Sequence, residues 1–390
     1  MKPISSLTRR IPANAATAAD ARARELAASG RDVINFCVGE PDFSAPPEPC
    51  EAAIETIRTG NTHYTSPDGT AELKAAVSAA LSRRGWPAYA ANEIVITAGA
   101  KYAVYAAVSV LAEPGDEFLI PSPAWPSYGQ IVRLAHAVPV PVLSLAENGF
   151  RMTSAALEAM CTARTKAIIL NNPCNPTGVL YSEAELCAIL EVCARKDLYV
   201  ICDEVYHSFL YNGAKFTPFA SLSADARDRT ITIGGLSKTY GMTGWRLGWL
   251  CGNAGIMSAA KAFVNHTTGN PSTIAQAAAV AALSLPDDTF EPLRREYESR
   301  RNFLLHALRS SGLPCVTPQG AFYVLADVCP RGFSSGEEFA RELLEEEAVA
   351  VVPGEGYDAA GFVRLAYTLP EDRLREGAAR ISAFTRRHRR

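Results

Sequence analysis

Short apolar runs alternate with helical segments through the middle of this chain, and this alternation restricts the possible folds more than any other feature. The apolar runs lie at 93–97, 117–120, 167–170, 198–202 and 230–233. Capping boxes, Ser182 with Glu185 and Ser335 with Glu338, open two of the helical segments. Strands separated by helices predict a mainly parallel sheet with helices on both faces, which is the α/β class.

The composition changes near residues 285–288, where a long charged helical stretch begins. Further strand patterns lie outside the main series, at 33–38, 321–328 and 362–367. These patterns predict a second α/β unit that combines both ends of the chain. We therefore expect a large domain of residues 48–284 and a smaller, discontinuous domain of residues 1–47 and 285–390.

Polar and small residues follow each predicted strand of the main series. They occupy 98–101, 121–125, 171–178, 203–206 and the stretch around Lys238. In an open α/β sheet the ligand lies beyond the carboxyl ends of the strands. Backbone N–H groups at Gly99, Ala100 and Lys101, where a helix begins, can hold a phosphate group. The sequence therefore predicts one ligand site at this edge of the sheet.

Lys238 and Arg246 follow the last predicted strand and are separated by small and flexible residues. A lysine amine can form a Schiff base with an aldehyde, and an arginine binds a phosphate dianion through its fork of donors. Pyridoxal phosphate carries both groups, so we interpret the pair as its binding site. The Ser237 hydroxyl is a further candidate ligand of the phosphate.

Other strand-end residues suit the ring of this cofactor. Asp203 would keep the pyridine nitrogen protonated, so that the ring withdraws electrons from a substrate carbanion. Asn175 and Tyr206 can donate hydrogen bonds to the phenolic oxygen, and Trp125 offers an indole that can stack on the ring. Lys238, once displaced by a substrate amine, is placed to move the proton between Cα and the cofactor.

The segment 235–248, GLSKTYGMTGWRLG, resembles the lysine-site motif of class I/II aminotransferases, which are pyridoxal-phosphate enzymes of fold type I. Matching motifs are spread over nearly the whole chain, at 39–43, 64–69, 99–101, 175–178, 203–206 and 362–365. The sequence is most similar to the branch of prokaryotic aspartate and aromatic aminotransferases. The resemblance implies that residues 48–284 bind the cofactor and that the smaller domain closes over the substrate.

The resemblance also implies roles that the residues alone do not give. Arg364 would bind the α-carboxylate of the substrate as a bidentate pair, and the backbone at Gly39 would close over the substrate. Trp125 and Asn175 would contact the substrate as well as the cofactor. Tyr64 would reach the cofactor phosphate of a neighbouring subunit, which implies a homodimer with shared active sites.

The side chain of the preferred amino acid stays open between acidic, aromatic and neutral types, with a 2-oxo acid such as 2-oxoglutarate as acceptor. A cation at Lys101 would meet the distal carboxylate of aspartate, although a solvated lysine on a first helical turn explains it equally well. Asn14 is a weaker candidate for the same pocket. Gly235 departs from many members of the family, which carry a serine there, so the phosphate site has one hydroxyl fewer.

Two other functions compete with transamination. A pyridoxal-phosphate lyase of the same fold, of the C–S lyase or aminocyclopropane-carboxylate synthase type, would use the same carbanion to eliminate a substituent. A transcriptional regulator with an aminotransferase-like module would need a DNA-binding domain before that module. The motif series here begins at Gly39, which disfavours the regulator.

Composition narrows the class of protein further. A formal net charge of -3 does not favour a nucleic-acid or anionic-membrane partner. Residues 1–12 lack the apolar core of a secretory signal, and no apolar run approaches the roughly 20 residues of a membrane span. The ten cysteines show neither a CxxC pair nor metal-ligand spacing. We therefore expect reduced thiols, no metal and a cytoplasmic location.

Overall fold

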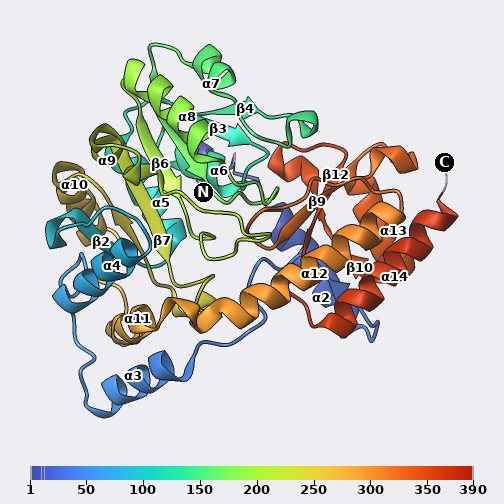
Figure 1. The fold of residues 1–390 in the computed structure, drawn as a ribbon, viewed down its shortest axis with the longest axis horizontal. Coiled ribbons are helices and arrows are strands. Elements are labelled where there is room, and N and C mark those ends of the chain that lie inside the picture. The colour runs from blue at the N-terminus through green and yellow to red at the C-terminus, as the bar shows by residue number, and fades with distance from the viewer. Residues whose placement is uncertain (1, 10, 13, 389–390) are drawn as a thin grey trace.

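A seven-stranded sheet of order β2-β8-β7-β6-β5-β3-β4 forms the centre of one half of the molecule (Figure 1). The computed structural model describes residues 2–9, 11–12 and 14–388. The strands are β2 (Ile94–Thr97), β3 (Glu117–Ser122), β4 (Val138–Leu143), β5 (Thr165–Asn171), β6 (Tyr199–Asp203), β7 (Thr230–Gly235) and β8 (Gly248–Cys251). Only β8 runs antiparallel to its neighbours, β2 and β7. The predicted α/β class with a mainly parallel sheet is confirmed.

All five strands predicted for this sheet are present, and two further strands were not predicted. Strand β4 reads VPVPVL, and its prolines hide the strand pattern because proline cannot donate to a sheet ladder. It lies at the sheet edge and pairs only with β3, so the missing donors leave no partner unsatisfied. Strand β8 is only four residues long and begins with glycine.

Helices cover both faces of the sheet, so alternate residues of each strand are buried on opposite sides. Phe118 and Ile120 pack against α5 (Ala100–Leu111), α6 (Ser127–Leu134) and α10 (Ala254–Asn265). Leu119 between them packs on the opposite face, with residues of α7 (Ser154–Met160), α8 (Glu183–Arg195) and α9 (Ala224–Arg229). The helices α3 (Pro47–Arg58), α4 (Ala71–Arg83) and α11 (Thr273–Ser284) complete this half.

The two predicted capping boxes form differently. At the start of α8, Ser182 Oγ accepts from the Glu185 backbone N–H, and the Glu185 carboxylate accepts from the Ser182 backbone N–H. At the start of α13 (Gly336–Glu347), Ser335 accepts from the Glu338 backbone, but the Glu338 carboxylate accepts from the backbone N–H of Ser334 instead. The second box is therefore displaced by one residue on its carboxylate side.

The other half of the molecule combines a segment of the N-terminal part of the chain, which includes α2 (Ala15–Ala28), with the C-terminal part (Figure 1). Strands β9 (Tyr323–Asp327), β12 (Phe362–Ala366) and β11 (Val352–Pro353) form an antiparallel sheet of order β11-β12-β9, and β1 (Ile34–Asn35) pairs in parallel with β10 (Val349–Ala350). The predicted strand at 33–38 is therefore shorter than expected, but it does pack with the C-terminal segment. The helices that pack here are α2, α13 and α14 (Glu371–Arg387), and the short helix α1 (Ser6–Arg9) precedes α2 in the chain.

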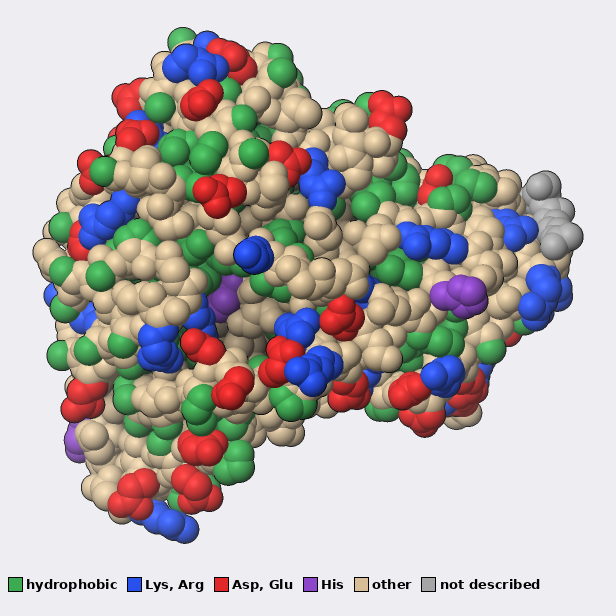
Figure 2. Space-filling view, viewed as in Figure 1, with side chains coloured by type: hydrophobic (Ala, Val, Ile, Leu, Met, Phe, Trp, Pro, Cys, Tyr) green, Lys and Arg blue, Asp and Glu red, His purple; other side chains and the backbone are tan. Residues whose placement is uncertain are grey.

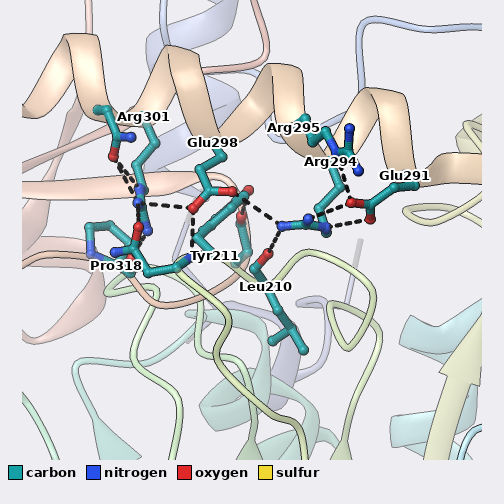
Figure 3. A network of polar contacts seen from close by, with 11 residues as sticks. Leu210, Tyr211, Glu291, Arg294, Arg295, Glu298, Arg301 and Pro318 are labelled. Atoms are coloured by element: carbon teal, nitrogen blue, oxygen red, sulfur yellow. Dashed lines mark hydrogen bonds and ion pairs between the residues drawn. The ribbon is translucent and has the colours of Figure 1, made fainter.

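Helix α12 (Glu291–Ser310) runs between the two halves (Figure 1) and is held by a polar network (Figure 3). Arg294 donates to the Leu210 carbonyl at 2.9 Å. The fully buried Arg301 donates to the Pro318 carbonyl at 2.8 Å and lies over the Tyr211 ring. Because a buried guanidinium is costly without partners, these contacts fix α12 against the segment that follows β6 and the segment that precedes β9.

The surface gives no sign of a large patch of one charge on the face shown in Figure 2, where acidic and basic side chains are interspersed. Within the described part of the chain, no helix is long and apolar enough to span a bilayer. The interspersed charges agree with the small formal net charge of -3.

Candidate active site

A cavity of about 340 Å³ lies beyond the carboxyl ends of the parallel strands. Strand ends of the large sheet, the start of α2 and strands β9 and β12 all contribute to its wall. The predicted residues that line it are Asn14, Gly39, Ala100, Lys101, Trp125, Asn175, Asp203, Tyr206, Gly235, Ser237, Lys238, Arg246 and Arg364. The fold thus brings residues from distant parts of the chain to a single site.

Lys238 lies in the segment after β7, and its side chain is half-buried in the cavity wall. Its Nζ donates to the Gly39 carbonyl at 2.6 Å. Burial lowers the pKa of the amine to about 8, and the nearby Glu40 carboxylate opposes this shift. A useful fraction of neutral amine therefore exists near neutral pH, as a nucleophilic lysine requires.

Asp203 ends β6 and is almost fully buried. Its Oδ2 accepts from the Tyr128 hydroxyl at 2.7 Å, and its Oδ1 accepts from the Val205 N–H at 3.4 Å. Burial raises the pKa of Asp203 to about 6, while the Tyr128 hydrogen bond favours the carboxylate. Asp203 is therefore ionised at pH 7 and offers a buried anion to a cationic group in the cavity.

The start of α5 and the Arg246 guanidinium form a cradle of donors. Gly99 has a φ of 90°, and a Cβ atom there would lie 2.6 Å from Arg246 Nη2. Similarly, a Cβ at Gly248 would lie 2.5 Å from the Ala100 nitrogen. The two glycines keep the backbone N–H groups of the first turn of α5 uncovered next to the guanidinium, which suits an anion.

Gly235, the position that departs from many members of the family, is tightly packed. A Cβ there would lie 3.2 Å from the Leu247 carbonyl oxygen and 3.6 Å from the Ala100 Cβ. A serine at this position would need its neighbours to shift by a few tenths of an ångström. The glycine is therefore matched to the local spacing of β7 and β8.

Arg364 is buried on β12 and its guanidinium lies 4.5 Å from the Tyr323 ring and 5.3 Å from the Tyr357 ring. Nη2 donates to the Cys37 carbonyl at 2.6 Å, and Nη1 donates to Asn175 Oδ1 at 3.3 Å. Its Nε is buried and has no hydrogen-bond partner among the described residues. The fork is thus held in place with N–H groups left for a ligand.

Lys101 and Trp125 lie together at the cavity wall. The Lys101 ammonium lies 4.9 Å from the centre of the Trp125 ring, a cation–π distance. Burial lowers the pKa of Lys101, and the Arg246 cation adds to the shift. Lys101 therefore borders the site while its residue remains exposed to solvent.

Two predicted residues do not line this cavity. Gly99 lies next to the Arg246 guanidinium, and its N–H donates to the Thr97 carbonyl at 2.7 Å, so the prediction that this N–H holds a phosphate is wrong. Tyr64 is 98% exposed and borders a separate hollow of about 490 Å³. Its other lining residues are Thr62, His63, Asn270, Ser272, Thr273 and Ile274.

The structure adds residues that the sequence did not identify. Tyr128 follows Trp125 by three residues, and its N–H donates to the Trp125 carbonyl in the turn that opens α6. This closeness in sequence to Trp125 was the available signal. Asn171 accepts from the Asn175 N–H at 2.7 Å and thereby positions it. Tyr323 bonds to the Tyr206 hydroxyl at 2.9 Å. It reaches the cavity from β9, and no sequence pattern indicates that approach.

Comparisons with known proteins agree with this geometry. Residues 31–381 match the family model described as aminotransferase class I and II. The chain is 40% identical to an aspartate aminotransferase of Bacillus subtilis, over 99% of both chains. It is 39% identical to an aspartate/prephenate aminotransferase of Cereibacter sphaeroides, over 98% of both. The solved structure of the Thermus thermophilus aspartate aminotransferase with maleate superposes with a TM-score of 0.94 at 36% identity, over 98% of this chain and 100% of that one.

The chain therefore belongs to the class I and II aminotransferases, enzymes that depend on pyridoxal phosphate. It is an aminotransferase, and its reaction is transamination between an amino acid and a 2-oxo acid. The lyase alternative is not favoured. The site fits the cofactor chemically, because a buried amine, a buried carboxylate and an anion cradle line one cavity.

Proposed function

We propose that this aminotransferase acts on aspartate, with 2-oxoglutarate as the amino-group acceptor. The observation that carries the proposal is that two separate cations, Arg364 and Lys101, line the same cavity. A dicarboxylic substrate would then place its α-carboxylate at Arg364 and its distal carboxylate near Lys101. The relatives named as aspartate aminotransferases, one of them solved with the dicarboxylate maleate, support this choice.

Different residues would bind the different chemical groups of the cofactor. Asp203 would hold a proton on the ring nitrogen, and Trp125 would stack on the ring. Asn175 and Tyr206 would donate to the phenolic oxygen. The phosphate would be bound by Arg246, by the N–H groups of Ala100 and Lys101, and by the Ser237 hydroxyl.

When bound, pyridoxal phosphate would supply an electron sink for the electron pair left at the substrate Cα. Lys238 would attach the cofactor through its amine and, once displaced by the substrate, carry the Cα proton on Nζ. Arg364 would orient the amino acid by its carboxylate. The backbone at Gly39 would cover it and exclude water.

We further propose the domain division that this chemistry requires. Residues 48–284 would form the cofactor domain, while residues 1–47 and 285–390 would close over the substrate. The pairing of β1 with β10 supports a shared unit of the two chain ends.

A cytoplasmic location is proposed because all ten cysteines are free thiols. Recovery of the protein in the membrane or secreted fraction after cell fractionation would contradict this location.

A panel of single-turnover reactions tests the substrate. The visible absorbance band of the bound cofactor should disappear rapidly with aspartate, and slowly with phenylalanine or alanine. Lys101→Met should slow the reaction with aspartate about tenfold or more, since one charge-assisted contact is lost. Lys166→Met is the matched control, because Lys166 also lies over an aromatic ring, that of Tyr199, but away from the cavity. Rapid reaction with aromatic amino acids alone would overturn the proposal.

We also propose a homodimer in which Tyr64 binds the phosphate in the partner's site. Tyr64 is 98% exposed, yet its loop is firmly held. The buried Asp68 accepts from Lys74 at 2.6 Å, and Gln276 accepts from the Thr70 N–H at 2.8 Å. Tyrosine is enriched at protein interfaces, which agrees with an exposed Tyr64 on a loop held by these contacts.

Mixed dimers test this arrangement. Tyr64→Ala and Lys238→Ala should each lower or abolish activity, and mixing the two variants under exchange conditions should restore part of it. If Tyr64 acts across the interface, one site of a mixed dimer carries both changes and the other carries neither. No recovery despite demonstrated subunit exchange, or a monomer in analytical ultracentrifugation, would refute the shared site.

A further inference from the structure

Tyr128 is a buried tyrosine of α6 whose hydroxyl has a single described use. It is 2% exposed, and its hydroxyl donates to Asp203 Oδ2 at 2.7 Å. Its ring stands edge-on to Trp125 at 5.2 Å, and its backbone N–H donates to the Trp125 carbonyl at 3.1 Å. These contacts aim the phenol at one oxygen of the carboxylate.

The groups that face Asp203 give it little other stabilisation. The Val205 N–H lies 3.4 Å from Oδ1. Lys238, in the segment after β7, is a cation near Asp203, but its Nζ donates a hydrogen bond to the Gly39 carbonyl. The remaining titratable neighbours are Cys174 in the β5–α8 loop, Cys202 beside it on β6, and Glu204 and Tyr206, which follow it in the chain. None of these four is a cation. Of the two hydrogen bonds that the described residues make to the Asp203 carboxylate, the one from the Tyr128 hydroxyl, at 2.7 Å, is the shorter.

We propose that Tyr128 is a positioning residue that keeps the Asp203 carboxylate ionised and aimed at the ring nitrogen of the cofactor. This proposal rests on the role proposed for Asp203 above. A phenol suits the task because it remains a donor. Burial and the Asp203 anion together raise the pKa of Tyr128 well above its usual value, so it does not lose its proton in the working pH range.

The hydrogen bond from Tyr128 would affect where the proton between the Asp203 carboxylate and the cofactor ring nitrogen resides. An Asp203 carboxylate that accepts from Tyr128 is a weaker base, so the proton between the carboxylate and the ring nitrogen stays on nitrogen. Without the phenol donor, the carboxylate becomes more basic and draws that proton toward itself. The ring then withdraws electrons less strongly and is bound less tightly.

The test uses the holoenzyme reconstituted with ¹⁵N-labelled pyridoxal phosphate, whose nitrogen resonance reports ring protonation. In Tyr128→Phe the resonance should move toward that of unprotonated pyridine. The dissociation constant of the cofactor should rise about tenfold or more, the size of one charge-assisted hydrogen bond. Tyr181→Phe is the matched control, because Tyr181 borders the same small cavity as Tyr128 and its buried hydroxyl accepts from the Met152 N–H at 3.0 Å. It should leave both readouts unchanged.

The variants distinguish a failure of the role proposed for Tyr128 from a failure of the role proposed for Asp203. If Asp203→Asn leaves the nitrogen protonated as in the wild type, the role of Asp203 is wrong. If Asp203→Asn removes the proton while Tyr128→Phe matches Tyr181→Phe in both readouts, the role of Tyr128 is wrong.

A second variant covers the case in which Tyr128→Phe fails to fold. 3-Fluorotyrosine at position 128 is nearly isosteric and a stronger donor, so the ring nitrogen should stay protonated and the dissociation constant of the cofactor should fall. A dissociation constant that is unchanged or raised, or a resonance moved toward that of unprotonated pyridine, would overturn the proposal.

Discussion

Replacement of Arg364 by lysine keeps a positive charge at the end of the cavity and removes the planar fork of donors. In the structure Nη2 is held by the Cys37 carbonyl and Nη1 by Asn175, and Nε has no described partner. A carboxylate can therefore take two of the remaining N–H groups side by side, whereas an ammonium offers a single point of contact. Loss of one charge-assisted hydrogen bond costs about 1.5–3 kcal/mol, which corresponds to about a 10- to 160-fold fall in kcat/KM.

Replacement of Arg364 by leucine removes the charge as well. Loss of one partner from a buried ion pair costs about 3–5 kcal/mol, so kcat/KM should fall by a factor of about 160 to 5,000. Because every amino acid carries an α-carboxylate, the fall should be similar for aspartate, phenylalanine and alanine. If Arg364 instead bound the side chain of the substrate, the fall in kcat/KM would be confined to one class of amino acid.

Steady-state kinetics with the three amino acids measure these changes. The visible cofactor band and the melting temperature serve as controls, since Arg364 also packs between two tyrosine rings. A loss confined to one amino acid, or a kcat/KM unchanged by leucine in a folded, cofactor-loaded variant, would refute the assignment of Arg364 to the α-carboxylate.

Three further predictions concern the cofactor. Lys238→Ala should abolish the visible band of the bound cofactor; an unchanged spectrum would show that another group attaches it. Because burial lowers the pKa of Lys238 to about 8, the rate of cofactor capture by cofactor-free protein should rise about tenfold per pH unit below pH 8 and level off above it. A rate independent of pH between 6 and 8 would contradict this. Gly99→Ala should weaken cofactor binding, since its Cβ would meet Arg246. Gly85→Ala, with a φ of 96° and no atom within 4 Å of its Cβ, should lose stability alone; equal cofactor affinity in both variants would argue against the cradle.

The strands of the large sheet could be predicted where periodicity and burial agree. Strands β5, β6 and β7 are buried on both faces and read as continuous apolar runs. Strand β8 was missed because four residues give no period to detect, and its antiparallel insertion between β2 and β7 depends on tertiary packing. Strand β4 was missed because its prolines are tolerated only at an edge, and edge position is not visible in a sequence.

The same distinction applies to the site. Residues at the ends of parallel strands could be placed together because topology fixes where those ends meet. Tyr323 could not, since it depends on how β9 docks against the large sheet. Its hydroxyl bonds to Tyr206 and lies 3.4 Å from the Gly39 carbonyl, and its ring supports Arg364. This residue therefore links elements that no local pattern relates.

The charges around the cavity suit both roles proposed for Lys238, that of nucleophile and that of base. Burial lowers the pKa of Lys238 most, and the Arg364 and Arg246 cations lower it further. A low pKa favours the neutral amine that must attack an aldehyde. Bound anions would then offset these two cations, a phosphate at Arg246 and a carboxylate at Arg364. With that repulsion relieved, the amine becomes more basic when it must take a proton from Cα. The same arginines that hold the ligands would thus adjust Lys238 from nucleophile to base.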